Sequence, residues 1–365
     1  MEWLKQLRST SMKKSIPGLL LFVIAAAALL FFSKCYGVFG MLSPKTFSEL
    51  TPETLNGAFV DDDVPVIYDY YLEEVKTKNG RTVGTVSRQY IIDLDDELYY
   101  MGLYAHDGAM KDANEMMQAC EKALNGELDP AELPVYHVRG MIRAMTEEDL
   151  GYYREYTDGL DMDEYFLPYY LEVEYINGLP IVLSWILLGV AVLLLGLGIW
   201  PVIKALTGGF QKQVRAKLSE SGSLEAEAER AERFYESAPE TCGVRMDRNY
   251  VFFQNGAESI LLRPWDVAWA YQSTTQHRTN GIPTGKTYAA ILRTMDGKQY
   301  TLGMKEAEVQ TLLETMASTL PGVVLGYDKE LERLYKENRN AFRQRWEEKL
   351  PELGQTRGFS GGGSL

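Results

Sequence analysis

The sequence is poor in the residues that carry catalysis, metal binding and covalent cross-links. Of its 365 residues only three are cysteine and three are histidine. Cys35, Cys120 and Cys242 fall in three different regions, which excludes a disulfide framework and a zinc site built from paired cysteines. His106 and His137 belong to no metal-binding or catalytic-triad spacing. The sequence therefore predicts no catalytic residue, no cofactor and no metal site.

A basic excess is also missing. The net charge is −14, and it is carried by one segment. Residues 34–178 have 11 Lys or Arg against 29 Asp or Glu, a balance of −18, whereas the residues before them sum to +3 and those after them to +1. Binding to phosphate backbones needs a basic face, so this distribution excludes a nucleic-acid partner.

Two long charge-free stretches dominate what is present. No charged residue stands between Glu174 and Lys204, which exceeds the roughly 20 residues needed to cross a bilayer. We predict a transmembrane helix over residues 179–206. A second apolar run covers residues 16–32 and predicts a first transmembrane helix with its exit over 15–42. A cleaved signal peptide is the alternative, but the run is longer than the usual 7 to 15 residues, and Lys34 precedes Cys35 where a lipoprotein signal needs a small residue.

Cationic residues near the ends of the two runs predict the orientation. They gather before the first run and after the second, at Lys5, Arg8, Lys13, Lys14, Lys204, Lys212, Arg215 and Lys217. Under the positive-inside rule this places both termini in the cytoplasm, with residues 1–14 as a cytoplasmic tail. We expect a two-span protein of the cell membrane, in contact with the lipid bilayer, with residues 43–178 outside.

The segment 43–178 has the pattern of a mixed domain. Residues 64–75 alternate, with Val66, Tyr68, Tyr70 and Leu72 on one face, and Asn79-Gly80 predicts a hairpin turn before a return strand over 82–92. Further strands are predicted over 98–104, 134–145 and 167–176, and helices over 112–124 and 146–156, the latter with Thr146 as N-cap. Between Tyr36 and Tyr175 lie 16 of the 23 tyrosines, 15 of them in this acidic domain. Its acidic clusters at 61–63, 93–97 and 158–164 lack the spacing of a calcium loop and are interpreted as solvated turns.

The C-terminal part begins with a linker over 207–243, which contains a predicted helix over 224–237. From residue 244 to 326, short strands flank two hairpin turns, Asn255-Gly256 and Asp296-Gly297, and an apolar stripe predicts a helix over 305–320. We expect an open β-barrel closed by a helix. Residues 327–365 are predicted as a last helix, over 328–346, and a flexible tail that ends in GGGSL.

Several of these stretches resemble a known group. VRMDRNYVFFQNG, RPWDVAWAYQ, TYAAILRTMDGKQYTLGM and PGVVLGYDKELERLYKENRNAF are similar to the pleckstrin-homology-like (PH-like) cytoplasmic module of uncharacterised two-span proteins from Gram-positive bacteria. VYHVRGMIRAMTEEDLGYYREY and LPYYLEVEYINGLP resemble the extracytoplasmic insert of the same group. The resemblance covers about residues 15–346. It implies an α+β membrane protein with an inserted extracytoplasmic domain and a PH-like barrel, and no known reaction.

One polar stretch is the candidate binding site. Residues 273–286 form the longest polar loop expected in the C-terminal part, with His277, Arg278 and Lys286 and no acid. These three residues are predicted to contact a lipid headgroup or a partner. The stretch also contains Gly281-Ile-Pro-Thr-Gly285-Lys286-Thr287, but this has one residue too few between its glycines for a phosphate-binding loop and precedes a predicted strand rather than a helix.

Two functions stay open. The first is a non-enzymatic adaptor that binds protein partners through its acidic outer domain or its PH-like module, because neither domain has a catalytic constellation. The alternative is a membrane-anchored enzyme or enzyme subunit that acts on cell-wall or sugar substrates through carboxylates of the outer domain. A channel is disfavoured, since two spans without an internal charge offer no ion pathway.

Overall fold

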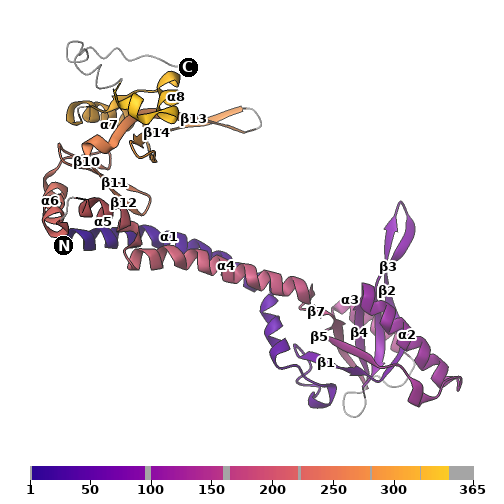
Figure 1. The fold of residues 1–365 in the computed structure, drawn as a ribbon. Coiled ribbons are helices and arrows are strands. Elements are labelled where there is room, and N and C mark those ends of the chain that lie inside the picture. Colours follow the sequence, from indigo (N-terminus) through magenta and orange to yellow (C-terminus); the bar gives the residue numbers. More distant parts are fainter. Residues whose placement is uncertain are drawn as a thin grey trace. The chain divides into compact units, whose positions relative to one another are not determined.

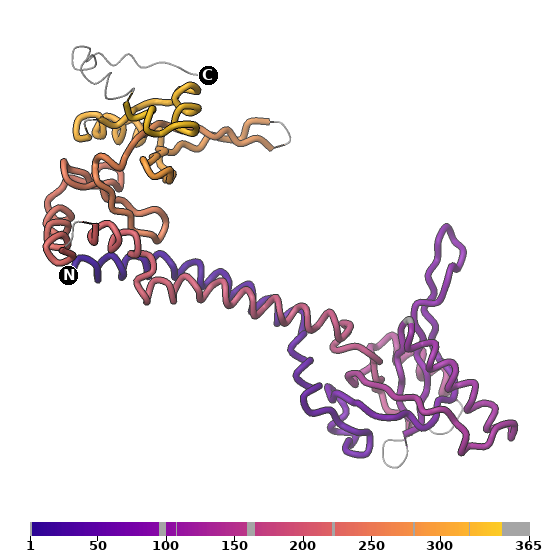
Figure 2. Tube along the Cα trace, viewed as in Figure 1, coloured from indigo at the N-terminus to yellow at the C-terminus, as the bar shows by residue number. Residues whose placement is uncertain are grey.

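A computed structural model describes residues 2–94, 100–158, 165–220, 223–279, 282–320 and 322–344 (Figure 1). The chain divides into two compact units. One unit comprises residues 22–196, and the other joins residues 1–21 to residues 197–365 (Figure 2). The second unit therefore unites the two ends of the chain. The fold is mixed α+β, as expected.

Among the described residues, two helices are long and apolar enough to cross a membrane, α1 (Glu2–Ser33) and α4 (Ile181–Leu206). Their large side chains are widely exposed, for example Leu21 at 66% and Trp200 at 67%. α4 lies where the charge-free run before Lys204 predicted it. α1 is longer than predicted, because residues 2–14, expected as a tail, continue the same helix. Lys, Gln, Arg and Leu in this part favour helix, and its buried side chains hold it in place.

The inserted domain follows α1 and precedes α4 along the chain. It is built on one six-stranded sheet with the order β1-β5-β6-β4-β3-β2. The strand pairs are antiparallel except β4 and β6, which run parallel. A short pair, β7 with β8, leads into α4. The strands are β1 (Phe59–Val64), β2 (Val66–Lys78), β3 (Arg81–Asp93), β4 (Tyr100–His106), β5 (Tyr136–Ala144), β6 (Phe166–Val173), β7 (Tyr175–Ile176) and β8 (Leu179–Pro180).

Helix α2 (Asp107–Leu124) covers one face of this sheet and buries Met116 and Cys120 in its core. Helix α3 (Glu147–Thr157) packs near β2 and starts with the predicted Thr146 cap, here a full capping box with Asp149. Short 3₁₀ turns complete the domain at η1 (Cys35–Leu42), η2 (Phe47–Glu49) and η4 (Pro130–Glu132).

Two sequence predictions for this domain were wrong in detail. The alternation expected over 64–75 fails because β2 contains bulges, so Ile67 is fully buried and Tyr68 is exposed. The acidic cluster 61–63, interpreted as a turn, lies in β1. Most of the other two clusters, residues 95–97 and 159–164, lies outside the described residues.

The β2–β3 hairpin confirms the Asn79-Gly80 turn, whose φ angles are +53° and +74°. Positive φ at both positions is what a type I′ hairpin turn requires. The hairpin extends beyond the neighbouring strand, since β4 pairs with β3 only from Ser87 onward. It therefore forms an exposed arm (Figure 1).

The C-terminal module consists of two four-stranded sheets rather than one barrel; no closed barrel is found in the described part of the chain. The sheet orders are β12-β11-β10-β9 and β15-β14-β13-β16. α7 buries Val309, Leu312 and Met316 in a core that both sheets share. The strands are β9 (Glu240–Thr241), β10 (Val244–Met246), β11 (Val251–Asn255), β12 (Glu258–Leu262), β13 (Val267–Thr279), β14 (Ile282–Thr294), β15 (Gln299–Met304) and β16 (Val324–Leu325).

The helices of this module include α5 (Lys212–Ser219), α6 (Leu224–Ser237), α7 (Glu306–Thr319) and α8 (Lys329–Glu337), with turns η6 (Gly209–Gln211) and η7 (Pro264–Asp266). α6 matches its prediction. α8 packs Tyr335 beside the fully buried Trp269 and ends at Glu337. Helix resumes over residues 339–344, so the predicted helix over 328–346 is interrupted at Asn338. The predicted tail lies outside the described residues.

Candidate functional site

The first turns of α1 lie in a hydrophobic core with α5, α6, β11 and β12. Trp3 and Leu7 are 2% and 0% exposed. The Trp3 ring lies 5.7 Å from the Tyr235 ring and 6.1 Å from the Phe252 ring. We call this set the shared core; it contains Trp3, Leu4, Leu7, Val214, Leu218, Ala228, Ala231, Phe234, Ala238, Tyr250, Phe252 and Leu261. It joins the start of the chain to residues more than 200 positions later.

Hydrogen bonds extend this contact along α1. Ser11 Oγ donates to the carbonyl of Ala257 at 2.6 Å and accepts from Gln211 Nε2 at 2.8 Å. Lys14 Nζ donates to the carbonyl of Gly256 at 3.1 Å. Both carbonyls belong to the β11–β12 turn, so about one turn of the helix, from Ser11 to Lys14, is fixed to it.

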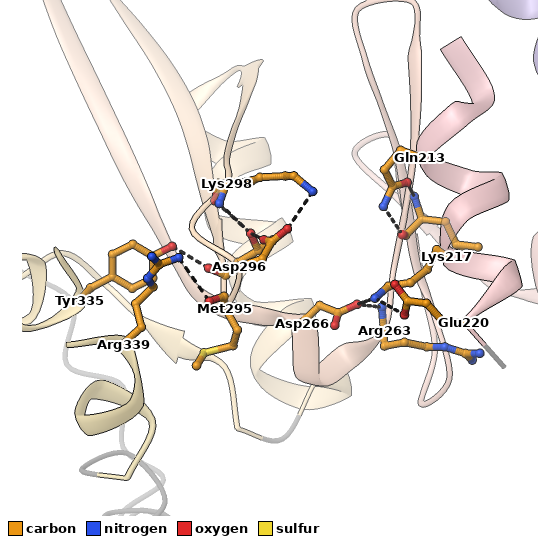
Figure 3. A network of polar contacts seen from close by, with 12 residues as sticks. Gln213, Lys217, Glu220, Arg263, Asp266, Met295, Asp296, Lys298, Tyr335 and Arg339 are labelled. Atoms are coloured by element: carbon orange, nitrogen blue, oxygen red, sulfur yellow. Dashed lines mark hydrogen bonds and ion pairs between the residues drawn. The ribbon is translucent and has the colours of Figure 1, made fainter. Parts of the chain in front are cut away.

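α5 is attached to the edge of β12 by one glutamine. Gln213 Nε2 donates to the carbonyl of Leu261 at 2.8 Å, and Gln213 Oε1 accepts from the Leu261 amide at 2.8 Å (Figure 3). The side-chain amide thus satisfies backbone groups that a further strand would otherwise pair. A helix that directly follows α4 is in this way connected to the sheet.

Lys217, one turn further along α5, makes two ion pairs. Its Nζ lies 2.8 Å from Asp266 Oδ2 and 2.8 Å from Glu220 Oε2 (Figure 3). Burial alone would lower the pKa of Lys217, but the hydrogen bonds to Asp266 and Glu220 outweigh it and raise that pKa. These residues line a hollow of about 210 Å³ together with Gln213, Ala216, Leu262, Asp296 and Lys298. Lys298 is paired with Asp296 at 2.7 Å, so each lysine of the hollow has a carboxylate partner.

Glu227 is the buried charge that fastens α6. Its side chain is 7% exposed and accepts from Tyr250 Oη at 2.7 Å and from Arg263 Nη2 at 2.6 Å. The exposed Arg230 adds a third bond at 2.7 Å. The hydrogen bonds from Tyr250 and Arg263 lower the pKa of Glu227 despite its burial. α6 therefore closes over the sheet through a satisfied ion pair.

The predicted binding residues do share one element, but it is a hairpin rather than a loop. His277 and Arg278 lie on β13, and Lys286 on β14 opposite Gln276. All three are exposed. Threonines on both sides favour strand, and the two strands pair almost to the turn, with a bulge between His277 and Arg278. We call residues 274–279 and 282–287 the cationic arm (Figure 1).

The structure of residues 282–287 bears on the phosphate-loop pattern of Gly281–Thr287. Residues 282–287 are strand and continue in β14, as expected, so no helix follows them as a phosphate-binding loop requires. His277 Nε2 lies 3.0 Å from Thr287 Oγ1 across the arm.

In the inserted domain, His137 is clasped by two carboxylates. Its Nδ1 lies 2.8 Å from Asp63 Oδ1, and its Nε2 lies 2.7 Å from Asp61 Oδ1. The hydrogen bonds to Asp63 and Asp61 raise the pKa of His137. The clasp joins β1 to β5, because Asp63 and His137 are cross-strand partners.

Among the described carboxylates of this domain, Glu172 is the most buried, with a side chain that is 4% exposed. Arg143 Nη1 donates to it at 2.9 Å, and His106 Nε2 lies 3.6 Å away. His106 itself is held between the rings of Tyr104 and Tyr175, each with its centroid 4.2 Å away. A separate hollow of about 650 Å³ at the end of α3 is lined by Glu155 and Asp158 but not by Glu172. Glu172, Arg143 and His106 therefore form a packed network in which Arg143 compensates the charge of Glu172.

Sequence reasoning missed the shared core, Gln213 and Glu227. A signal for the first was present, because Trp3, Leu7, Ser11 and Ser15 follow one another every four residues and form one buried helix face. The pairings of Gln213 and Glu227 depend on strands far away in the sequence, and no local pattern indicates them.

Comparison with known proteins identifies the chain at the level of a family. A family model described as a domain of unknown function (DUF8577) matches residues 4–204, more than half of the chain. The chain belongs to this family. A second family model, also described as a domain of unknown function (DUF6709), matches residues 208–335. No curated protein and no solved structure matches the chain. The two matches meet at the end of α4, although α1 packs on the module that the second match covers.

Proposed function

We propose that this protein spans a membrane twice and acts as a non-enzymatic adaptor, with both chain ends in the cytoplasm. The shared core is the observation that carries this proposal. Trp3 and Leu7 at the start of α1 are buried with Phe234 and Phe252 of the C-terminal module. The start of α1 and the chain that follows α4 therefore belong to one folded body. A body of this kind lies on one side of a membrane, and the cations around it favour the cytoplasmic side.

The inserted domain would then lie outside, and the module would be PH-like. Two four-stranded sheets around the α7 helix support the second point. In this arrangement the Ser11, Gln213 and Lys217 contacts connect both membrane helices to the sheet. A displacement of either helix would be passed to the module, which is what an adaptor between two compartments requires.

The cationic arm supports a binding role for the module. Arg278 and Lys286 are exposed, the arm has no acidic residue, and its strands lack further neighbours, since β15 pairs with β14 only from Tyr288 onward. A two-stranded ribbon is marginally stable on its own. We assign the arm to a protein partner with an acidic surface, with His277, Arg278 and Lys286 as the contacts.

The enzyme alternative receives less support. It requires a desolvated carboxylate that faces a cleft beside a second one. Glu172 is desolvated, but Arg143 compensates its charge and it does not line the described hollow of this domain.

The arm is tested by affinity capture of the full-length protein from gently solubilised membranes. We expect a captured protein that is lost in Arg278→Glu with Lys286→Glu and at high salt. The matched control is Arg333→Glu with Lys336→Glu on α8, which changes the charge of the same module equally. Equal capture by wild type and both variants would refute the arm as the contact, and no captured protein under any condition would refute the adaptor.

A further inference from the structure

Three cationic side chains meet where α4 ends. A Cβ placed on Gly208 would lie 3.1 Å from Arg8 Nη2 and 3.3 Å from Arg215 Nη2. The two guanidinium nitrogens are therefore at most about 6.4 Å apart, the sum of these distances. Lys204 lies against the next residue, Gly209, with its Nζ 4.6 Å from the centre of the Phe210 ring. Gly208 has φ +73° and is buried beneath these side chains.

In the described part of the chain, no carboxylate pairs with the two guanidinium groups. Within the described ranges, neither Arg8 nor Arg215 has a hydrogen-bond or ion-pair partner, whereas Lys217 on the same helix as Arg215 has two carboxylates. Two guanidinium groups this close repel each other unless an anion lies between them. The carboxyl end of α4 attracts cations, but it does not satisfy the ten N–H donors that two arginines present.

The spacing suits one phosphate group. Its oxygens accept charge-assisted hydrogen bonds from two arginines, which is the common mode of phosphate recognition by guanidinium groups. The surface before Gly208 is apolar and exposed, at Trp200, Ile203 and Leu206 with 67%, 45% and 54% exposure. A ligand with a phosphate and hydrocarbon chains would match both the two arginines and this exposed apolar surface.

We propose that Arg8 and Arg215 bind the phosphate of an anionic phospholipid in the cytoplasmic leaflet, with Lys204 adding charge to the site. This inference rests on the proposed function, because it needs α1 and α4 to cross the bilayer. Bound lipid would then join the start of α1 to α5 at the membrane surface.

The test is native mass spectrometry of the full-length protein in detergent, titrated with phosphatidylglycerol, phosphatidylcholine or inorganic phosphate. We expect a preference for phosphatidylglycerol of roughly 25-fold, at about fivefold for each arginine near an anionic headgroup. Arg8→Gln with Arg215→Gln should reduce the preference to within about threefold. The control Arg248→Gln with Arg333→Gln, exposed positions of the same module, should leave it unchanged.

Equal affinity for both lipids in the wild type, or an unchanged preference in the Arg8 and Arg215 variant, would overturn the proposal. Displacement of the lipid by equimolar inorganic phosphate would assign the site to free phosphate instead. If the glutamine variant unfolds, Arg8→Lys with Arg215→Lys retains the charge without the guanidinium fork, and it should lose part of the preference. Thiol labelling, described at the end of the Discussion, tests the topology separately, so a correct topology without lipid preference would refute this site alone.

Discussion

The ion pair of Glu227 in the C-terminal module is buried, whereas the contacts of His137 with Asp61 and Asp63 in the inserted domain are exposed to solvent. Glu227 holds three partners and His137 holds two, all at 2.6 to 2.8 Å. Glu227 is 7% exposed, whereas His137 is 60% exposed. Similar distances therefore carry different free energies, since water screens the clasp and not the buried pair. Burial, rather than the number of ion pairs, decides where the molecule is sensitive.

The strongest test of this comparison removes buried apolar surface rather than charge. Trp3→Ala should lower the free energy of unfolding of the C-terminal module by about 3–5 kcal/mol, because it empties the centre of the shared core. The exposed Leu124→Ala, in the inserted domain, is the control. Urea unfolding, monitored by limited proteolysis of each domain, measures the free energy of unfolding of both variants. A module as stable as the wild type would show that α1 does not pack on it.

Removal of the buried charge should have the next largest effect. Glu227→Gln removes the buried carboxylate that accepts from Arg263 and should destabilise the module by about 2–3 kcal/mol. Arg230→Gln removes only the exposed partner and should cost at most about 1 kcal/mol. Equal effects of the two variants would contradict the role of burial.

The two sites should also respond oppositely to pH. The pKa of Glu227 is lowered in the folded state, so its contribution is present above its unfolded pKa and is lost as the pH falls through the folded pKa, in the acid range. The pKa of His137 is raised, so its contribution is full below the unfolded pKa of about 6.5 and is lost as the pH rises through the folded pKa.

The clasp should give the smallest effect. We expect the inserted domain to lose about 0.2–1 kcal/mol of stability between pH 6 and pH 9, and His137→Gln should remove this dependence. Thermal unfolding followed by tyrosine fluorescence across that pH range measures it. A stability that rises with pH in the wild type would contradict the sign.

The sequence predicted those features that local chemistry determines. Asn79-Gly80 and Thr146 specify a turn and a cap by themselves, and the charge-free run before Lys204 specifies an apolar helix. The features that failed depend on distant partners. The acidic stretch 61–63 is a strand because β5 pairs with it, and 274–287 is a hairpin because its two halves pair beyond the body of the sheet.

The candidate residues also divide into those that the local sequence indicates and those that depend on distant partners. His277, Arg278 and Lys286 were found from composition, and the structure brings them onto one arm. The junction of the chain ends was missed because Trp3 meets Phe252 only after the whole chain is folded. A four-residue spacing of buried positions in residues 3–15 was the one readable clue.

The central claim is that both chain ends form one body on one side of a membrane. Thiol labelling of intact cells with an impermeant reagent tests it directly, in a Cys242→Ser background that leaves only the buried Cys35 and Cys120. Single cysteines replace Lys5, Lys78 and Lys286. The account predicts that Lys78→Cys is labelled in intact cells, while Lys5→Cys and Lys286→Cys are labelled together and only after permeabilisation. Labelling of Lys5→Cys and Lys286→Cys from opposite sides would contradict it.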